Sequence, residues 1–216
     1  MRNKRHTRPT HPSRVTIPAA LAAGLLAVSS LPLLQGCAAA VVAGIAVGAG
    51  VAHERRDAKT VLEDQQIEVQ AMAAEFNDAD IQAKSSISAT SYNHVVLLTG
   101  RADSEEISQR FADKVSRLPG VKRVINEVTI GPPADLTRQS QDTIITSQVK
   151  FALTKIDLPG FDPTRVKVVT EMGVVYLMGL VSAQEADAAV EKARYVSGVK
   201  KVVKVFEYVE PTPASA

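Results

Sequence analysis

The stretch Val95-Val96-Leu97-Leu98-Thr99-Gly100 recurs later in the chain as Val174-Val175-Tyr176-Leu177-Met178-Gly179. Further along, Gly120-Val121-Lys122-Arg123-Val124 is matched by Gly198-Val199-Lys200-Lys201-Val202, at a spacing shorter by a single position. Upstream, Asp64-Gln65-Gln66-Ile67 is matched by Asp142-Thr143-Ile144-Ile145 at the same spacing as this second pair. A nearly constant period of this length indicates that the chain contains two copies of one structural unit.

Each copy is predicted to fold in the order α-β-β-α-β. In the first copy we expect helices over residues 62–76 and 104–118 and strands over 83–91, 95–101 and 121–130. In the second copy we expect helices over 142–155 and 182–196 and strands over 165–171, 174–181 and 199–209. Asp142 is predicted to cap its helix, and Gly100 and Gly179 are expected in turns at strand ends. Three strands with two helices on one face form a two-layer sandwich, so the predicted fold class is α+β with two such domains in tandem.

The composition along the chain divides it into six segments. These are a signal peptide over 1–36, a lipidated tether over 37–57, a first domain over 58–131, a linker over 132–141, a second domain over 142–210 and a disordered tail over 211–216. The run from Ala38 to Ala52 contains the pair Gly44 and Gly48, whose spacing permits close helix packing in an apolar span. The run is shorter than the roughly 20 apolar residues that a span needs, so a flexible tether near the membrane surface is the other interpretation.

The N-terminal region has the features of an export signal. Five basic residues precede an apolar run over 17–34, and the run ends in Leu34-Gln35-Gly36-Cys37. A cysteine directly after Leu-Gln-Gly resembles a bacterial lipobox, in which the thiol of Cys37 is acylated and becomes the first residue of the mature chain. An ordinary signal peptide and a transmembrane helix are the alternatives, and Pro18 and Pro32 argue against the helix. Ala38 follows the cysteine. In the enterobacterial lipoproteins that this motif resembles, an aspartate at that position commonly retains the protein at the inner membrane, so the resemblance implies the outer membrane.

The charge of the whole chain is dominated by this signal. The full sequence has a formal net charge of +2, but residues 1–36 hold five basic residues and no acidic ones. The mature chain then has 20 basic and 23 acidic residues, a net charge of −3. The apparent basicity therefore gives no reason to expect a nucleic-acid partner. Because Cys37 is the single cysteine, its acylation leaves no thiol for a disulfide.

Catalytic motifs are missing from the mature sequence. Its two histidines, His53 and His94, have no neighbours at the spacing of metal ligands. The sequence contains no Gly-x-Ser-x-Gly, phosphate-loop or His-Glu-x-x-His pattern. Glu105-Glu106 lies where a first helical turn is expected, and carboxylates there stabilise the helix dipole. We therefore expect no enzyme activity, no catalytic residue, no metal site and no cofactor.

The strand ends Val-x-Leu-x-Gly, the Gly-Val-x-x-Val final strands and the α-β-β-α-β order resemble BON domains. Two such domains behind a lipobox resemble the dual-BON-domain outer-membrane lipoproteins of the DolP (YraP) type, most closely over 142–146 and 177–181. The resemblance implies a non-catalytic protein, lipid-anchored on the periplasmic face of the outer membrane, whose second domain binds anionic phospholipid and supports envelope integrity. Envelope or cell-wall-remodelling proteins are implied as partners. In the best-known member a tryptophan stands where this chain has Ile144.

The helix expected over 142–155 carries the predicted binding residues. Ile145, Val149 and Ala152 are spaced to face the core, whereas Ile144 and Phe151 form a neighbouring apolar stripe that the core does not require. Apolar groups that enter the headgroup region and lysines that meet phosphates are typical of a peripheral lipid-binding surface. The predicted phospholipid contacts are therefore Ile144, Gln148, Lys150, Phe151, Leu153 and Lys155.

Other interpretations of this stripe remain open. Ile144 and Phe151 would also be apolar if they packed against the first domain or bound a partner protein, which would make the chain a periplasmic interaction scaffold. An enzyme or a peptidoglycan-binding module is a third and weaker hypothesis. In the phospholipid-binding interpretation the first domain serves as a spacer or as a protein-docking module.

Overall fold

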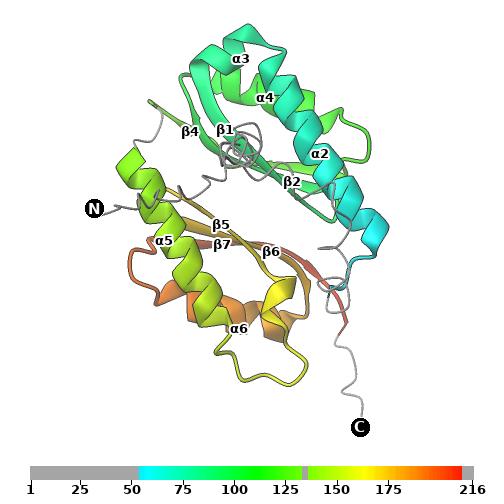
Figure 1. Ribbon diagram of the computed structural model, residues 1–216, viewed down its shortest axis with the longest axis vertical. Helices are drawn as coiled ribbons and strands as arrows, with labels where there is room; N and C mark the ends of the chain where they lie inside the picture. The colour runs from blue at the N-terminus through cyan, green and yellow to red at the C-terminus, as the bar shows by residue number, and fades with distance from the viewer. Residues whose placement is uncertain (1–53, 133–135, 211–216) are drawn as a thin grey trace, which may run out of the picture. The chain divides into compact units, whose positions relative to one another are not determined.

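The structure is a computed structural model that describes residues 54–132 and 136–210 (Figure 1). The predicted signal peptide over 1–36, the lipidation site Cys37, residues 38–53 of the tether and the tail over 211–216 lie outside the described residues. The described residues contain both copies of the repeat, and each copy forms a unit of helices and one sheet. We refer to these units as the first and the second domain.

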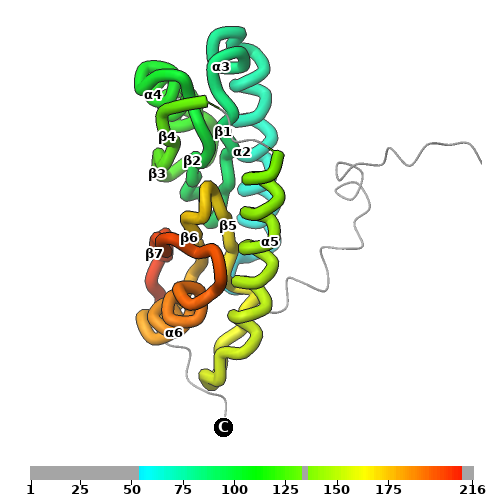
Figure 2. Tube along the Cα trace, turned by 90° about the vertical axis from the view of Figure 1, so that its left-hand side faces the viewer, coloured from blue at the N-terminus to red at the C-terminus, as the bar shows by residue number. Residues whose placement is uncertain are grey.

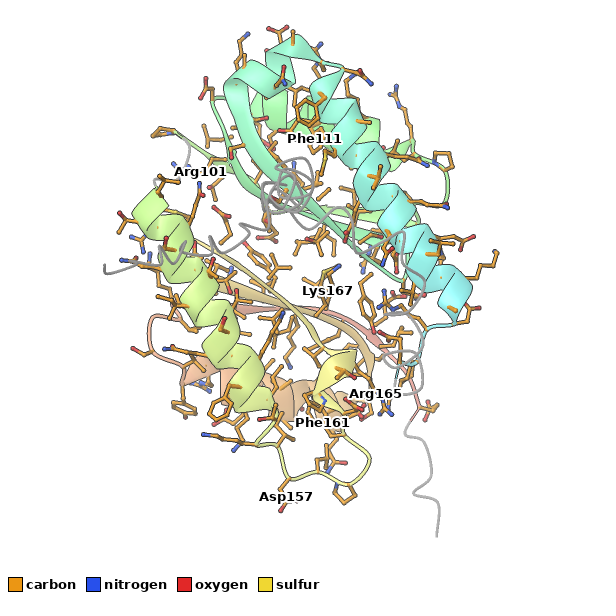
Figure 3. The ribbon with its side chains drawn as sticks, in the orientation of Figure 1. Arg101, Phe111, Asp157, Phe161, Arg165 and Lys167 are labelled. Carbon is orange, nitrogen blue, oxygen red and sulfur yellow. The ribbon has the colours of Figure 1, made fainter. Side chains whose placement is uncertain are left out.

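The first domain is built around strand β2 (Val95–Ala102), which has neighbours on both edges. Strand β1 pairs with β2 in the antiparallel direction, whereas β3 and β4 pair with it in parallel. The other elements are α2 (Ala58–Phe76), α3 (Ala79–Lys84), β1 (Ser85–Tyr92), α4 (Glu105–Ser116), β3 (Arg123–Asn126) and β4 (Thr129–Ile130). Ile67 of α2, Phe111 of α4 (labelled in Figure 3) and Val96 of β2 belong to one buried core.

The second domain repeats this arrangement around strand β6 (Val174–Val181). Its other elements are α5 (Leu136–Leu153), the 3₁₀ turn η2 (Pro163–Arg165), β5 (Lys167–Glu171), α6 (Ala183–Arg194) and β7 (Lys201–Tyr208). Strand β5 is antiparallel and β7 parallel to β6, and α5 is the long yellow-green helix beside β5 in Figure 2. Val149 of α5, Val175 of β6 and Ala189 of α6 meet in its core. The predicted α+β class with two α-β-β-α-β domains is confirmed.

A serine caps the second helix of each domain. The Ser104 hydroxyl accepts a hydrogen bond from the Ile107 amide at the start of α4. At the start of α6, Ser182 and Glu185 form a reciprocal capping box: each side chain accepts from the other residue's amide. Both caps satisfy amides that the first helical turn leaves without partners.

Several predicted element boundaries are wrong. Residues 79–84 form the short helix α3, so strand β1 begins at Ser85 and not at Ala83. The final strand of the first domain is interrupted between β3 and β4, where the Asn126 side chain accepts from the Val128 amide. Helix α5 already begins at Leu136, inside the predicted linker over 132–141.

Gly100 and Gly179 lie inside strands β2 and β6 and not in turns at strand ends, so that expectation is corrected. A Cβ atom added at Gly179 would lie 2.5 Å from the carbonyl oxygen of Arg165. A Cβ at Gly100, where φ is +114°, would collide with the carbonyl oxygen of Ser86. The repeated glycine is therefore required because another segment of backbone approaches the central strand closely at this point.

A buried aspartate holds the β-hairpin turn in each domain. The carboxylate of Asp142 accepts hydrogen bonds from the amides of Met172 and Gly173, both at 2.8 Å. Asp142 lies in the middle of α5, so its predicted role as the helix cap is wrong. Met172 has φ +54° and Gly173 has φ +81°, as a two-residue turn of type I′ requires. The carboxylate therefore compensates a turn that places a bulky residue in the left-handed region.

Asp64 of α2 has the same role in the first domain. Its carboxylate accepts from the amides of Asn93 and His94 at 2.7 and 2.8 Å, and also from the Ser91 hydroxyl at 2.6 Å. Asn93 and His94 likewise have positive φ, at 51° and 68°. Asp64 and Asp142, which match in the repeat, thus make the same contact with the hairpin turn of their domain. This contact explains why the repeat includes an acidic residue within a helix.

The sheet faces opposite the helices are also apolar. Leu97 of β2 and Tyr92 of β1 belong to one buried cluster with Tyr176 and Met178 of β6 and Val205 of β7. A continuous buried run such as 95–98 is typical of a strand covered on both faces. Residues of the two sheets therefore share one apolar cluster, in addition to the separate core of each domain.

Candidate membrane-binding site

Helix α5 of the second domain carries the predicted binding residues. Its buried positions recur every three or four residues and face the core. They include Ile145, Val149 and Asp142, which binds the hairpin turn. Ile144 and Phe151 lie two helical turns apart and therefore share another face. Their side chains are 56% and 62% exposed, so they do not pack against the first domain. This unpartnered apolar pair is the feature that the sequence pattern indicated.

Polar and basic side chains accompany this pair. Gln148, Lys150 and Lys155 are all exposed on the same helix or directly after it. The ammonium group of Lys155 lies 4.3 Å from the centroid of the Phe151 ring, a cation–π distance. Lys150 has no ion pair or hydrogen bond with any residue in the described ranges. The arrangement presents two apolar groups and two ammonium groups to solvent.

Leu153 was predicted to contact phospholipid, and this prediction is wrong. Its side chain is 1% exposed and belongs to the core with Val149 and Leu177. Leu153 follows Val149 by four residues, so helical geometry places both on the buried face. Phe161, in the loop after α5, is partly buried against the same core (Figure 3).

Helix α2 of the first domain has an exposed apolar row that was not expected from the sequence. Leu62, Val69, Met72 and Phe76 are between 52% and 65% exposed. Leu62, Val69 and Phe76 follow one another at intervals of two helical turns, so they lie along one side of the helix. The seven-residue spacing of Leu62, Val69 and Phe76 is visible in the sequence.

The residues just before α2 are held by charged contacts that the sequence did not predict. The guanidinium of Arg55 donates to both carboxylate oxygens of Glu185, at 2.6 and 3.0 Å, and to the Leu180 carbonyl at 2.8 Å. Arg56 pairs with Glu54 and Asp64 and lies 3.7 Å above the Tyr92 ring. The end of the predicted tether is therefore fixed to side chains of both domains.

Burial and these contacts act in opposite directions on the carboxylates. Burial by itself would raise the pKa of Glu185, but hydrogen bonds from Arg55 and from the Ser182 amide outweigh it and lower the pKa. For Asp64 burial also acts to raise the pKa, and the bonds from Ser91, the His94 amide and Arg56 lower it below the usual range. Both groups are thus held in the charged form, as structural ion pairs require.

The described residues offer no alternative site of metal chemistry. Within 54–132 and 136–210, no group of three or more His, Cys, Asp or Glu side chains is placed to hold a metal ion. His94 lies in the first-domain turn, where its Nε2 is 3.0 Å from Glu63. Among the helices of the described part, none combines the length and apolarity needed to cross a bilayer.

Comparison with known proteins gives the family. The BON domain family matches residues 63–132 and 141–210. The Outer membrane lipoprotein DolP of Haemophilus influenzae is 39% identical over 178 residues, which cover 82% of this chain and 91% of that protein. A 21 kDa hemolysin of Actinobacillus pleuropneumoniae is 35% identical over 155 residues, covering 72% of this chain and 79% of the relative. The chain belongs to the BON-domain family and, within it, to the tandem-domain lipoproteins of the DolP type.

A solved structure of CdsD, a structural protein of the type III secretion system of Chlamydia trachomatis, is also similar in part. It is 17% identical, with a TM-score of 0.26, and the alignment covers 68% of this chain and 63% of that chain. A similarity at this level adds nothing to the assignment of the fold.

Proposed function

We propose that this protein is a non-catalytic lipoprotein of the outer membrane that is anchored through Cys37 and binds anionic phospholipid through α5 of its second domain. The lipobox 34–37 supports the anchor, and the relative from Haemophilus influenzae is named an outer membrane lipoprotein. The protein faces the periplasm and supports the integrity of the envelope. Acylation of Cys37 predicts that Cys37→Ser moves the protein from the membrane fraction to the soluble fraction.

The observation that carries the lipid-binding proposal is the exposure of Ile144 and Phe151. Burying an exposed aromatic or aliphatic side chain in an apolar environment contributes roughly 1.5–3 kcal/mol. Each lysine near an anionic bilayer adds about 1 kcal/mol, and Lys150 and Lys155 lie beside these two groups. The second domain also has no net charge over 142–210, with nine basic and nine acidic residues, so an anionic surface does not repel it as a whole.

The test is flotation of the unanchored protein, residues 37–216 with Cys37→Ser, with phosphatidylcholine vesicles that contain or lack phosphatidylglycerol. Wild-type protein is expected to bind only the anionic vesicles. Phe151→Glu is expected to weaken binding at least about 30-fold, because it removes about 2 kcal/mol of burial and introduces a repelled charge.

Phe76→Glu on α2 is the matched control, because Phe76 and Phe151 are both 62% exposed and both changes add one negative charge. Binding by this variant is expected to stay within about two-fold of wild type. Wild-type protein that ignores anionic vesicles, or equal losses for both variants, would refute a lipid site on α5.

The alternative is a scaffold whose exposed helix faces bind partner proteins of the envelope or of cell-wall remodelling. The specific observation in its favour is the apolar row on α2, which lies outside the proposed lipid site. In that case Phe76→Glu would reduce recovery of a cross-linked partner from the periplasm, while vesicle binding would be absent from the wild type.

A further inference from the structure

We propose that the open edge of β7 binds the C-terminal segment of a partner protein as an added strand, with the partner's terminal carboxylate in a basic pocket between α6 and β7. This inference goes beyond the proposed function and does not depend on the lipid site on α5. Strand β7, red in Figure 2, is the last strand in the order β5-β6-β7, so it pairs with β6 on one side only. All eight of its residues, from Lys201 to Tyr208, are aligned with β6 without a break. Among the described residues, no strand pairs with its outer edge.

The other edges of the two sheets are covered, short or interrupted, which sets β7 apart. Strand β1 is equally long, but the Glu68 carboxylate accepts a hydrogen bond from the Ser91 amide of this strand at 2.8 Å. Glu75 of the same helix accepts another from the Ile87 amide of β1. The final strand of the first domain is divided into β3 and β4, and β5 has only five residues. An uncovered edge of eight residues offers its free amides and carbonyls to an extended chain.

The basic pocket lies at the start of this edge. It has a volume of about 350 Å³, and its described lining consists of three cationic and three apolar side chains with no carboxylate among them. The lining residues are Val190, Arg194, Val199, Lys200, Lys201 and Val202. A pocket of this composition suits an apolar terminal side chain together with the carboxylate that ends the chain.

Two of these cations are available to a ligand. Lys200 and Lys201 are exposed, and neither side chain forms an ion pair or hydrogen bond with a residue of the described ranges. Arg194 lies 3.5 Å from Glu191, but both side chains are more than half exposed, so this pair contributes little. An ammonium group without a carboxylate partner gains a charge-assisted hydrogen bond when a carboxylate approaches. Lys200 precedes the core residue Val202 by two positions and therefore points to the sheet face that α6 covers, so we assign the direct contact to Lys200.

The charge of β7 favours a partner with a free C-terminus over a second copy of this chain. Lys200, Lys201 and Lys204 stand within five consecutive residues, and lysines on an edge strand oppose its pairing with an identical edge. A partner's terminal carboxylate supplies the opposite charge. In antiparallel addition the C-terminus of the added strand lies at the start of β7, which is where the pocket is. A phospholipid could bring an anion to the pocket, but it has no row of amides to pair with the edge.

The test uses an array of hexapeptides that end in Val, Leu, Ile or Phe, each made with a free carboxylate and as its C-terminal amide. Unanchored residues 37–216 with Cys37→Ser should bind a subset of the free acids, and amidation should weaken binding at least about ten-fold by removing the charge-assisted contact. Lys200→Glu is expected to cause a similar loss, whereas Lys200→Arg should keep most of the binding. Lys122→Glu is the matched control, because Lys122 is the equivalent exposed residue of the first domain, and it should stay within about two-fold of wild type.

A second measurement tests the added strand itself. The tightest free-acid peptide is N-methylated at one amide at a time, and binding should weaken at every second position only, because an antiparallel strand bonds to its neighbour through alternate residues. Binding without this alternation, no preference for free acids over amides, or equal losses for Lys200→Glu and Lys122→Glu would overturn the proposal. So would shifts of the Lys200 and Lys201 amides with phosphatidylglycerol vesicles but with no peptide, which would assign the pocket to lipid. The lipid site on α5 is tested separately by Phe151→Glu, so either proposal can fail without the other.

Discussion

The buried aspartate of the second domain provides a quantitative test of how the repeat is stabilised. In Asp142→Ala the amides of Met172 and Gly173 lose the carboxylate that lies 2.8 Å from each of them. A buried donor left without a partner costs about 1–3 kcal/mol. The Gly173 amide is buried and the Met172 amide is partly buried, so we expect a loss of about 3 kcal/mol in the free energy of unfolding of this domain.

The assay is amide hydrogen exchange in unanchored protein, combined with urea unfolding. Exchange is required because two domains need not unfold in a single transition, and it reports each domain separately. A loss of about 3 kcal/mol corresponds to roughly 100-fold faster exchange for core amides of β5 and β6. The amides of the first-domain core should exchange at nearly the wild-type rate.

Asp157→Ala is the control, because Asp157 is exposed in the loop after α5. Surface changes of this kind stay within about 0.5 kcal/mol. The reasoning would be refuted if Asp142→Ala lost less than about 1 kcal/mol, or if the Met172 and Gly173 amides exchanged as slowly as in the wild type. Either result would mean that the turn holds its conformation without the carboxylate.

Three further predictions concern the same framework. Met172→Asn introduces the residue found at the equivalent position of the first domain, Asn93, and asparagine tolerates the left-handed conformation (φ +54°). Urea unfolding should therefore show a gain of about 0.5–1 kcal/mol in the free energy of unfolding, and a loss would contradict the strain argument. Gly179→Ala places a Cβ 2.5 Å from the Arg165 carbonyl oxygen, so thermal unfolding should show a loss of about 3 kcal/mol or failure to fold; near-neutral behaviour would exclude the close approach. Because the pKa of Asp64 is lower in the folded protein than the value of about 3.9 in the unfolded chain, its carboxylate stabilises the fold at pH values above about 3.9, and this contribution is lost as the pH falls through the folded-state pKa. Asp64→Asn should therefore be less stable than wild type at neutral pH, and the two stabilities should converge near about pH 2. A difference in stability that stays constant with pH would exclude this linkage.

The fold was predictable because both copies carry the same local signals. Serine caps before α4 and α6 and the apolar runs of β2 and β6 appear in both halves of the sequence, so each copy supports the interpretation of the other. The short helix α3 was missed because Ala79, Ile81 and Ala83 alternate with polar residues, which also fits a strand. Contacts distant in sequence decide in favour of the helix, because Asp78 caps it and pairs with Arg110 and Lys114 of α4.

The candidate binding site was predictable only in part. The spacing of Ile144 and Phe151 in the sequence identified an apolar face outside the core, and both side chains are exposed. The pairing of Arg55 with Glu185 was not predictable, because the two residues lie 130 positions apart and meet only through the tertiary fold. Asp142 was misassigned for the same reason. A helix cap depends on neighbouring residues, whereas the contact of Asp142 with the Met172 amide joins residues 30 positions apart.

The lipid anchor changes how strong the contact at α5 has to be. With Cys37 acylated as proposed, the second domain would meet the bilayer at an effective concentration set by the length of the tether, which is in the millimolar range for short linkers. A contact with a dissociation constant near 1 mM, equivalent to about −4 kcal/mol, would then be occupied about half of the time. Two exposed apolar side chains with two neighbouring lysines are of the right size for such a contact. The pairing of Arg55 with Glu185 fixes the end of the predicted tether to the second domain, which carries the proposed site. The occupancy of such a weak site would vary with the local density of anionic lipid, while the acylated Cys37 would keep the protein attached to the membrane.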